Sequence, residues 1–179
     1  MKYKMVLVLM CVVIGTLMGC NKADKADNES IDSFNEDTVS VSKPSKNDKN
    51  EAIKAMKTVL EYEFNGDGEG FINAAYPDKA IEQMLCGTQY TKETLINNMN
   101  RNFAHIKGAT FYDFKVVECT LADEHDLIVF DFEYGVMPEI CFKMTATYKC
   151  KLPGEDKPSL EQNDFTAYRY YNKWYAIVE

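Results

Sequence analysis

The chain has 179 residues, of which 27% are charged and 46% hydrophobic, and its formal net charge at pH 7 is −8. An acidic chain without a basic patch does not have the electrostatic footprint of a nucleic-acid-binding protein, and nucleic acid is excluded as an expected partner. The length allows one globular domain of ordinary size together with shorter segments of different character.

Residues 1–19 have the pattern of an export signal. Lys2 and Lys4 make a positive start, and residues 5–17 form an apolar run that is too short to span a bilayer comfortably. The Leu-Met-Gly-Cys sequence ending at Cys20 resembles the lipobox of bacterial lipoproteins, in which this cysteine takes a thioether-linked diacylglycerol. The pattern predicts a lipoprotein signal peptide that is cut before Cys20, with an ordinary secretory signal as the alternative.

Residues 20–49 are predicted to be a lipidated cysteine followed by a disordered linker. Asp, Asn, Ser and Lys dominate this segment, which has too few large apolar side chains to form a core. A flexible coil of this length spans roughly 30 Å, enough to lift a domain clear of the lipid headgroups. Two acyl chains on Cys20 give a lasting anchor, so we expect the protein on the extracytoplasmic face of the cell membrane. Cleavage removes two lysines and lowers the net charge from −8 to −10.

Residues 50–179 are predicted to form one α+β domain whose first half is helical. Apolar side chains recur at helical spacing, with polar residues between them, so that each helix has one stripe facing a core. Asn, Gly, Pro and Thr stand where helices commonly begin or end. The expected helices cover about 51–64, about 71–75, Pro77 to Gly87, and Thr91 to Gly108.

The second half is predicted to contain about five antiparallel strands. The clearest is 140–150, where apolar and polar side chains alternate as in a strand with one buried face and one wet face. Asn172-Lys173 is expected to be the two-residue turn of the last hairpin, because Asn tolerates the left-handed conformation. Helices followed by a strand meander predict helices packed on one face of a curved sheet. The expected strands cover 110–121, 127–134, 140–150, 165–171 and 174–178.

The ending Tyr170-Tyr171-Asn172-Lys173-Trp174-Tyr175 and the order of elements over 50–179 resemble a family of small lipoproteins. These are lipoproteins of Gram-positive bacteria whose exported domain has the nuclear-transport-factor-2-like, or cystatin-like, fold. The resemblance implies a cone between helices and sheet that often holds a small ligand. Some members of this fold are isomerases, dehydratases or cyclases, and most of the exported ones have no assigned activity.

Four side chains are candidates for the wall of such a cone, namely Phe142, Met144, Tyr148 and Trp174. They would hold a small apolar or amphipathic ligand, oriented by tyrosine hydroxyl groups. The same residues can instead fill a core, and an alternating apolar row is core more often than pocket. An enclosed cavity would favour a ligand-binding module. A filled cone with an exposed apolar patch would favour a structural lipoprotein or one that binds another envelope protein.

An enzyme is the third interpretation, because isomerase-like chemistry requires a carboxylate base in an apolar cone. Asp113 and Asp131 are the carboxylates on predicted strands. Asp131 is expected to point to water beside Glu133. The direction of Asp113 is obscured by a bulge expected between Val116 and Val117. No catalytic residue and no cofactor are therefore assigned.

No metal site is predicted either. His105 and His125 have no further ligand at metal-binding spacing. Residues 65–70 begin like a calcium-binding loop, but Tyr76 stands where the bidentate glutamate is required, so a polar turn between helices is favoured.

The sequence leaves open whether the cysteines of the domain form a disulfide bond or remain free thiols. Cys141 and Cys150 are expected on opposite faces of one strand and cannot pair with each other. A bond between Cys86 and Cys119 and free buried thiols are the alternatives.

Overall fold

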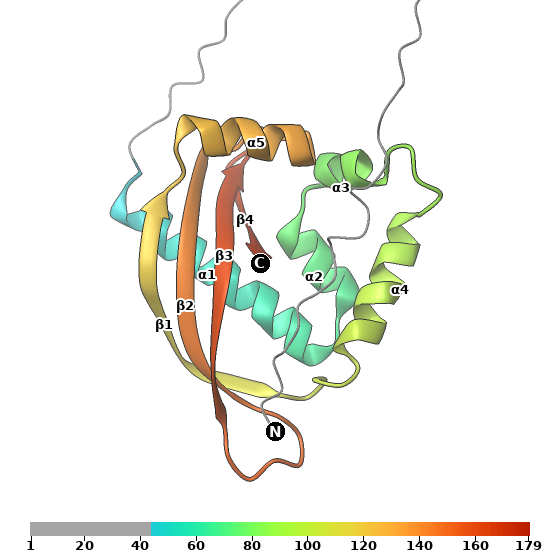
Figure 1. Cartoon of the computed structure of the whole chain (residues 1–179), viewed down its shortest axis with the longest axis vertical. Helices are drawn as coiled ribbons and strands as arrows, with labels where there is room; N and C mark the ends of the chain where they lie inside the picture. The colour runs from blue at the N-terminus through green and yellow to red at the C-terminus, as the bar shows by residue number, and fades with distance from the viewer. Residues whose placement is uncertain (1–43) are drawn as a thin grey trace, which may run out of the picture. The chain divides into compact units, whose positions relative to one another are not determined.

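The computed structural model describes residues 44–179, and the predictions for the signal peptide, Cys20 and most of the linker lie outside the described residues. The described part is α+β, with four helices followed by one four-stranded antiparallel sheet and a fifth helix between its first two strands (Figure 1). None of these helices combines the length and the apolar character that crossing a membrane requires. The helices are α1 (Lys46–Asn65), α2 (Gly68–Ala75), α3 (Asp78–Leu85), α4 (Lys92–Phe103) and α5 (Glu124–Tyr134), and the strands are β1 (Thr110–Leu121), β2 (Ile140–Lys151), β3 (Ser159–Tyr170) and β4 (Lys173–Val178).

All four predicted helices are present, but their bounds differ: α1 begins at Lys46 rather than near residue 51, α2 begins at Gly68, and α4 ends at Phe103 rather than at Gly108. Ser45 and Asp48 form a capping box: the Ser45 hydroxyl accepts from the Asp48 backbone N–H at 3.2 Å, and the Asp48 carboxylate accepts from the Ser45 N–H at 2.8 Å. Such a box satisfies two amide groups that a helix start leaves without partners. Residues 46–49, predicted as linker, are therefore helical.

The polar loop between α1 and α2 is the interhelical turn that the sequence favoured. Gly66 ends α1 in the left-handed conformation, and the Asp67 carboxylate caps α2 by accepting from the Gly70 N–H at 2.8 Å. A Cβ atom on Gly70 would lie 2.2 Å from the Tyr62 ring, so only glycine fits here.

The predicted strand over 127–134 is wrong, because these residues belong to α5. The Asp123 carboxylate accepts from the Asp126 N–H at 2.9 Å, and the Asp126 carboxylate accepts from the Asp123 N–H at 3.2 Å, which is a second capping box. Gly135 ends the helix with φ of 66°. The sheet thus has four strands instead of about five, and β1 pairs directly with β2.

The sheet confirms the alternation predicted for β2. Cys150 faces the side of the sheet that α1 covers, and Cys141 faces the other side, as expected. The register of β1 shifts between Val116 and Glu118, which confirms the expected bulge, and it shifts again between Tyr112 and Lys115. All four cysteines of the described residues are free thiols.

The last turn lies one residue earlier than predicted. Tyr171 and Asn172 connect β3 to β4 with φ of 47° and 60°. A tight hairpin turn with both central residues in the left-handed region matches the twist of the strands. Asn172 therefore has the predicted conformation, and Lys173 begins β4.

Apolar side chains are buried in two clusters on opposite faces of the sheet. The α1 cluster lies between the sheet and α1, and the α5 cluster lies between the other face and α2, α3 and α5. The prediction of helices on one face only is therefore wrong, since α5 lies across one end of the second face (Figure 1). Both clusters bury apolar area, which is the main favourable contribution to folding.

Candidate functional site

The four predicted cone residues lie on the same face of the sheet. Phe142, Met144 and Tyr148 are 5%, 2% and 1% exposed and belong to the α1 cluster. Trp174 is half-buried and stacks on Phe142 with ring centroids 5.9 Å apart. The Tyr148 ring also contacts Phe64, at 6.2 Å between centroids. These side chains pack against one another as a core does.

Trp174 also reaches an open groove between α1, α2 and the β3–β4 turn. The groove has a volume of about 510 Å³ and is lined by Tyr62, Asn73 and Asn172 among others. It is open to solvent. Phe142 stacks on the Trp174 ring, and the Arg169 guanidinium lies 5.9 Å from the centroid of that ring.

The carboxylates considered from the sequence lie outside the α1 cluster. Asp113 is exposed, adopts φ of 58°, and forms an ion pair with the Lys149 Nζ at 2.8 Å. The Lys149 hydrogen bond lowers the pKa of Asp113 below its usual value. Asp131 lies on α5, not on a strand, and the structure brings neither residue to the cone. No group of His, Cys, Asp and Glu within residues 44–179 is arranged to hold a metal ion.

Glu63 is a buried carboxyl group that the sequence reading missed. It is only 4% exposed, and burial raises the pKa of its carboxyl to about 7. Burial, and to a smaller extent the charge of Glu63, raises the pKa of the Tyr148 hydroxyl above its usual value. Glu63 follows Met56 by seven residues and so lies on the apolar stripe of α1, a signal that was present in the sequence. Glu63 does not line the groove beside Trp174.

In contrast to the packed core, α5 carries large apolar side chains that are exposed to solvent. Ile128, Val129 and Phe132 are 55%, 45% and 88% exposed. Successive helical residues are rotated by about 100°, so these three share one side of the helix. Leu127 and Phe130, each 7% exposed, lie on the opposite side in the α5 cluster. We call Ile128, Val129 and Phe132 the α5 ridge.

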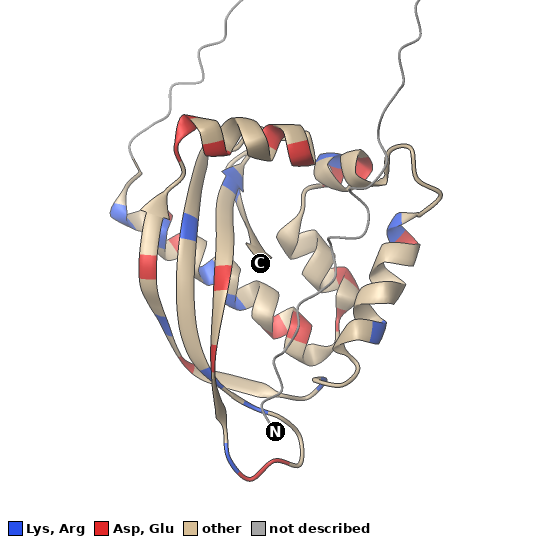
Figure 2. Ribbon diagram, in the orientation of Figure 1, with Lys and Arg blue, Asp and Glu red and all other residues tan. Residues whose placement is uncertain are grey.

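Acidic side chains border the α5 ridge on both sides. The helical rotation places Glu124 and Asp131 along one side and Asp126 and Glu133 along the other. No Lys or Arg occurs in α5, and Figure 2 shows acidic positions along this helix without a basic one. Asp126 is paired with the Lys143 Nζ at 2.5 Å, and this hydrogen bond lowers the pKa of Asp126.

The inner side of α5 holds the ridge in place. The Phe130 ring lies 4.6 Å from the Tyr168 ring, measured between centroids. The buried Tyr168 hydroxyl donates to the Ala75 carbonyl at 2.8 Å, which joins the sheet to α2. Together with the capping box and the Asp126–Lys143 pair, these contacts fix the helix that presents the α5 ridge.

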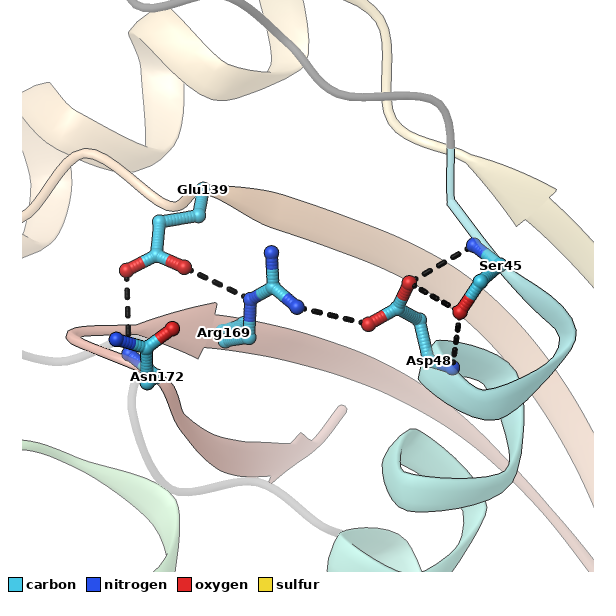
Figure 3. Close-up of polar contacts among 5 residues, drawn as sticks. All are labelled: Ser45, Asp48, Glu139, Arg169 and Asn172. Carbon is cyan, nitrogen blue, oxygen red and sulfur yellow. Dashed lines mark hydrogen bonds and ion pairs between the residues drawn. The ribbon is translucent and has the colours of Figure 1, made fainter.

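A cluster of polar side chains lies at the start of α1 (Figure 3). The Arg169 guanidinium on β3 donates to the Asp48 carboxylate and to the Glu139 carboxylate, each at 2.8 Å. Glu139 also accepts from the Asn172 N–H at 3.1 Å, while Asp48 completes the α1 cap with Ser45. Arg169 thus fastens the first turn of α1 to the sheet, a positioning contact rather than an open site.

No protein-family model matches the sequence, and a search of curated proteins gives no match. Function is therefore inferred from the domain itself. Its distinctive surface is the α5 ridge with its acidic borders, whereas three of the four cone candidates, Phe142, Met144 and Tyr148, are buried.

Proposed function

We propose that the protein is a lipoprotein anchored through Cys20 on the extracytoplasmic face of the cell membrane, whose domain binds another envelope protein through the α5 ridge. The observation that carries this proposal is the exposure of Ile128, Val129 and Phe132, with Phe132 at 88%. A contiguous exposed apolar patch on a soluble domain is characteristic of an interaction surface. The close packing of Phe142, Met144 and Tyr148 favours this interpretation over a ligand held in the cone.

The energetics of the α5 ridge support a partner. Complete burial of a large apolar side chain is worth about 1.5–3 kcal/mol. Covering three partly exposed ones would thus contribute several kcal/mol to binding, before the entropic cost of association. Aromatic residues such as Phe132 at the centre of a patch are typical anchors of protein interfaces.

We also propose that the domain belongs to the nuclear-transport-factor-2-like, or cystatin-like, class. The support is the order of helices before a curved antiparallel sheet (Figure 1). Four strands and the helix α5 between β1 and β2 differ from the simple meander expected for that class. Fold class alone would not determine the function.

The test is site-specific photocrosslinking in living cells of the native host. A photoreactive amino acid is placed at Phe132, and the matched control places it at Leu160, which is also strongly exposed, at 74%. Leu160 lies at the start of β3, at the opposite end of the sheet from α5 (Figure 1). We expect a discrete protein adduct from position 132 that disappears when Ile128→Ser is added, and no such adduct from position 160. Equal adduct patterns from both positions would contradict the proposal.

A small-ligand module is the second proposal, because the groove beside Trp174 is large enough for a small molecule. Trp174 is the single tryptophan of the chain, so its fluorescence reports directly on this groove. Protein isolated from the native envelope would carry a ligand detectable by native mass spectrometry, and removing it would shift Trp174 emission. If native mass spectrometry gave only the mass of the lipidated chain, with no added ligand, this second proposal would be contradicted.

A further inference from the structure

We infer that the partner segment bound by the α5 ridge is a cationic amphipathic helix, with an apolar stripe bordered by Lys or Arg on both sides. This inference rests on the proposed function and specifies its partner. It is based on the charges around the ridge and on the length of α5.

The charge pattern has the same sign on both sides of the α5 ridge. Glu124 and Asp131 border one side, and Glu133 borders the other beside Asp126. Among the described residues, Glu124, Asp131 and Glu133 form no ion pair, whereas Asp126 is paired with Lys143. Unpaired carboxylates at the rim of an interface select partners of opposite charge and raise the association rate. A partner with basic residues on both sides of its apolar stripe complements this arrangement.

Three other occupants of the ridge have the wrong charge. A second copy of this chain would bring two acidic borders together, which is unfavourable. An anionic lipid surface would be repelled by the same carboxylates. The apolar part of the linker, residues 31–41, contains three acidic residues and no lysine, so it too is poorly suited to the α5 ridge.

The length of α5 sets the length of the partner segment. The helix has 11 residues, which corresponds to roughly 16 Å at 1.5 Å per residue. A partner helix of about three turns can lie along it, with apolar side chains spaced three and four residues apart to contact Ile128 and Phe132. Recognition of one amphipathic helix by an apolar surface is a recurrent mode of peptide binding.

The probe is a fluorescein-labelled helical peptide made of leucine and lysine, with one leucine stripe bordered by lysines. The matched control peptide keeps the leucine stripe and replaces every lysine by glutamate. The lipidated protein is placed in phosphatidylcholine nanodiscs, and binding is followed by fluorescence anisotropy, with empty nanodiscs as background. Vesicles containing phosphatidylglycerol test the lipid alternative in parallel.

We expect the lysine peptide to bind and the glutamate peptide not to bind. Phe132→Ser should weaken binding at least tenfold, and Asp131→Asn with Glu133→Gln should weaken it several-fold and flatten its salt dependence. Leu160→Ser should leave binding unchanged, and circular dichroism should show each variant folded. The inference would be overturned if both peptides bound equally or if Phe132→Ser left binding unchanged. It would also be overturned if the protein bound more strongly to vesicles containing phosphatidylglycerol than to the lysine peptide. A crosslink from position 132 without lysine-peptide binding would overturn the partner chemistry and leave the proposed function standing, whereas the absence of both would reject both.

Discussion

Two groups of apolar side chains in the same domain, the α1 cluster and the α5 ridge, differ in their exposure to solvent. In the α1 cluster, Phe142, Met144 and Tyr148 are almost completely buried. On the α5 ridge, side chains of similar chemistry are about half to nine-tenths exposed. Burial stabilises the fold, and exposure contributes nothing to it. Under the proposed function, stability and interaction depend on separate residues of this molecule, so substitutions can separate the two.

The largest effect on stability is expected in the α1 cluster. Phe142→Ala removes a buried ring that stacks on Trp174, and it should lower the free energy of unfolding by about 3–5 kcal/mol. Phe142→Leu keeps much of the volume and should cost roughly 1–2 kcal/mol. Urea unfolding followed by Trp174 fluorescence measures both. If alanine and leucine were equally tolerated, the cone would not be a packed core.

Glu63 should make the stability of the domain depend on pH. Its pKa rises from an ordinary 4.5 to about 7 in the folded chain, so the unfolded chain releases this proton more readily. Between those two pH values the free energy of unfolding therefore falls as pH rises, by roughly 3 kcal/mol from this group. Above pH 7 the contribution is constant.

The matched variant for this pH dependence is Glu63→Gln, which has nearly the same shape and no charge. It should be similar in stability to the wild type near pH 4.5 and more stable at pH 8. Denaturant unfolding from pH 4 to 8 gives the difference between the two proteins. Parallel curves would contradict the raised pKa, because they would show that Glu63 ionises as readily in the folded chain as in the unfolded one.

The Arg169 cluster is expected to have a smaller effect. Arg169→Ala removes the contacts that fasten the first turn of α1 to the sheet, and it should cost roughly 1–3 kcal/mol. The control is Lys54→Ala, because the Lys54–Glu51 pair is exposed and 3.9 Å long and should contribute little. Hydrogen exchange of residues 46–50 should increase only in the Arg169 variant. Unchanged protection there would mean that α1 is held without Arg169.

The sequence predicts a helix or a strand correctly where one hydrophobic pattern dominates the segment. The four helices before the sheet and the alternation of β2 were predicted correctly, because helical spacing and period-two alternation are distinct signals. Glu63 was missed, since a charged residue on an apolar stripe is rarely buried. The burial of Glu63 depends on which elements pack around α1, and the local sequence pattern does not contain that information. The predicted last turn, Asn172-Lys173, is one residue too late, because Tyr171 and not Lys173 adopts the left-handed conformation.

The wrong prediction at α5 concerns the same residues as the proposed function. Ile128, Phe130, Phe132 and Tyr134 alternate as in a strand, and this pattern led to the wrong element. In a helix these residues fall on two sides, so the apolar side chains of the α5 ridge are not required by the core. The capping residue Asp123 and the terminal Gly135 indicated a helix. Sequence reading is expected to fail at sites where residues serve function rather than folding.

The smallest stability effect is expected on the α5 ridge itself. Phe132→Ala removes little buried area, because Phe132 is 88% exposed, and alanine favours a helix by about 0.5 kcal/mol over phenylalanine. The variant should therefore be equally stable or more stable than the wild type by a few tenths of a kcal/mol, as measured by urea unfolding. The same substitution should remove the crosslink formed by a photoreactive residue at position 128. A residue whose removal leaves the fold intact and abolishes docking serves the partner rather than the fold, whereas a destabilisation above about 1 kcal/mol would show that Phe132 belongs to the core.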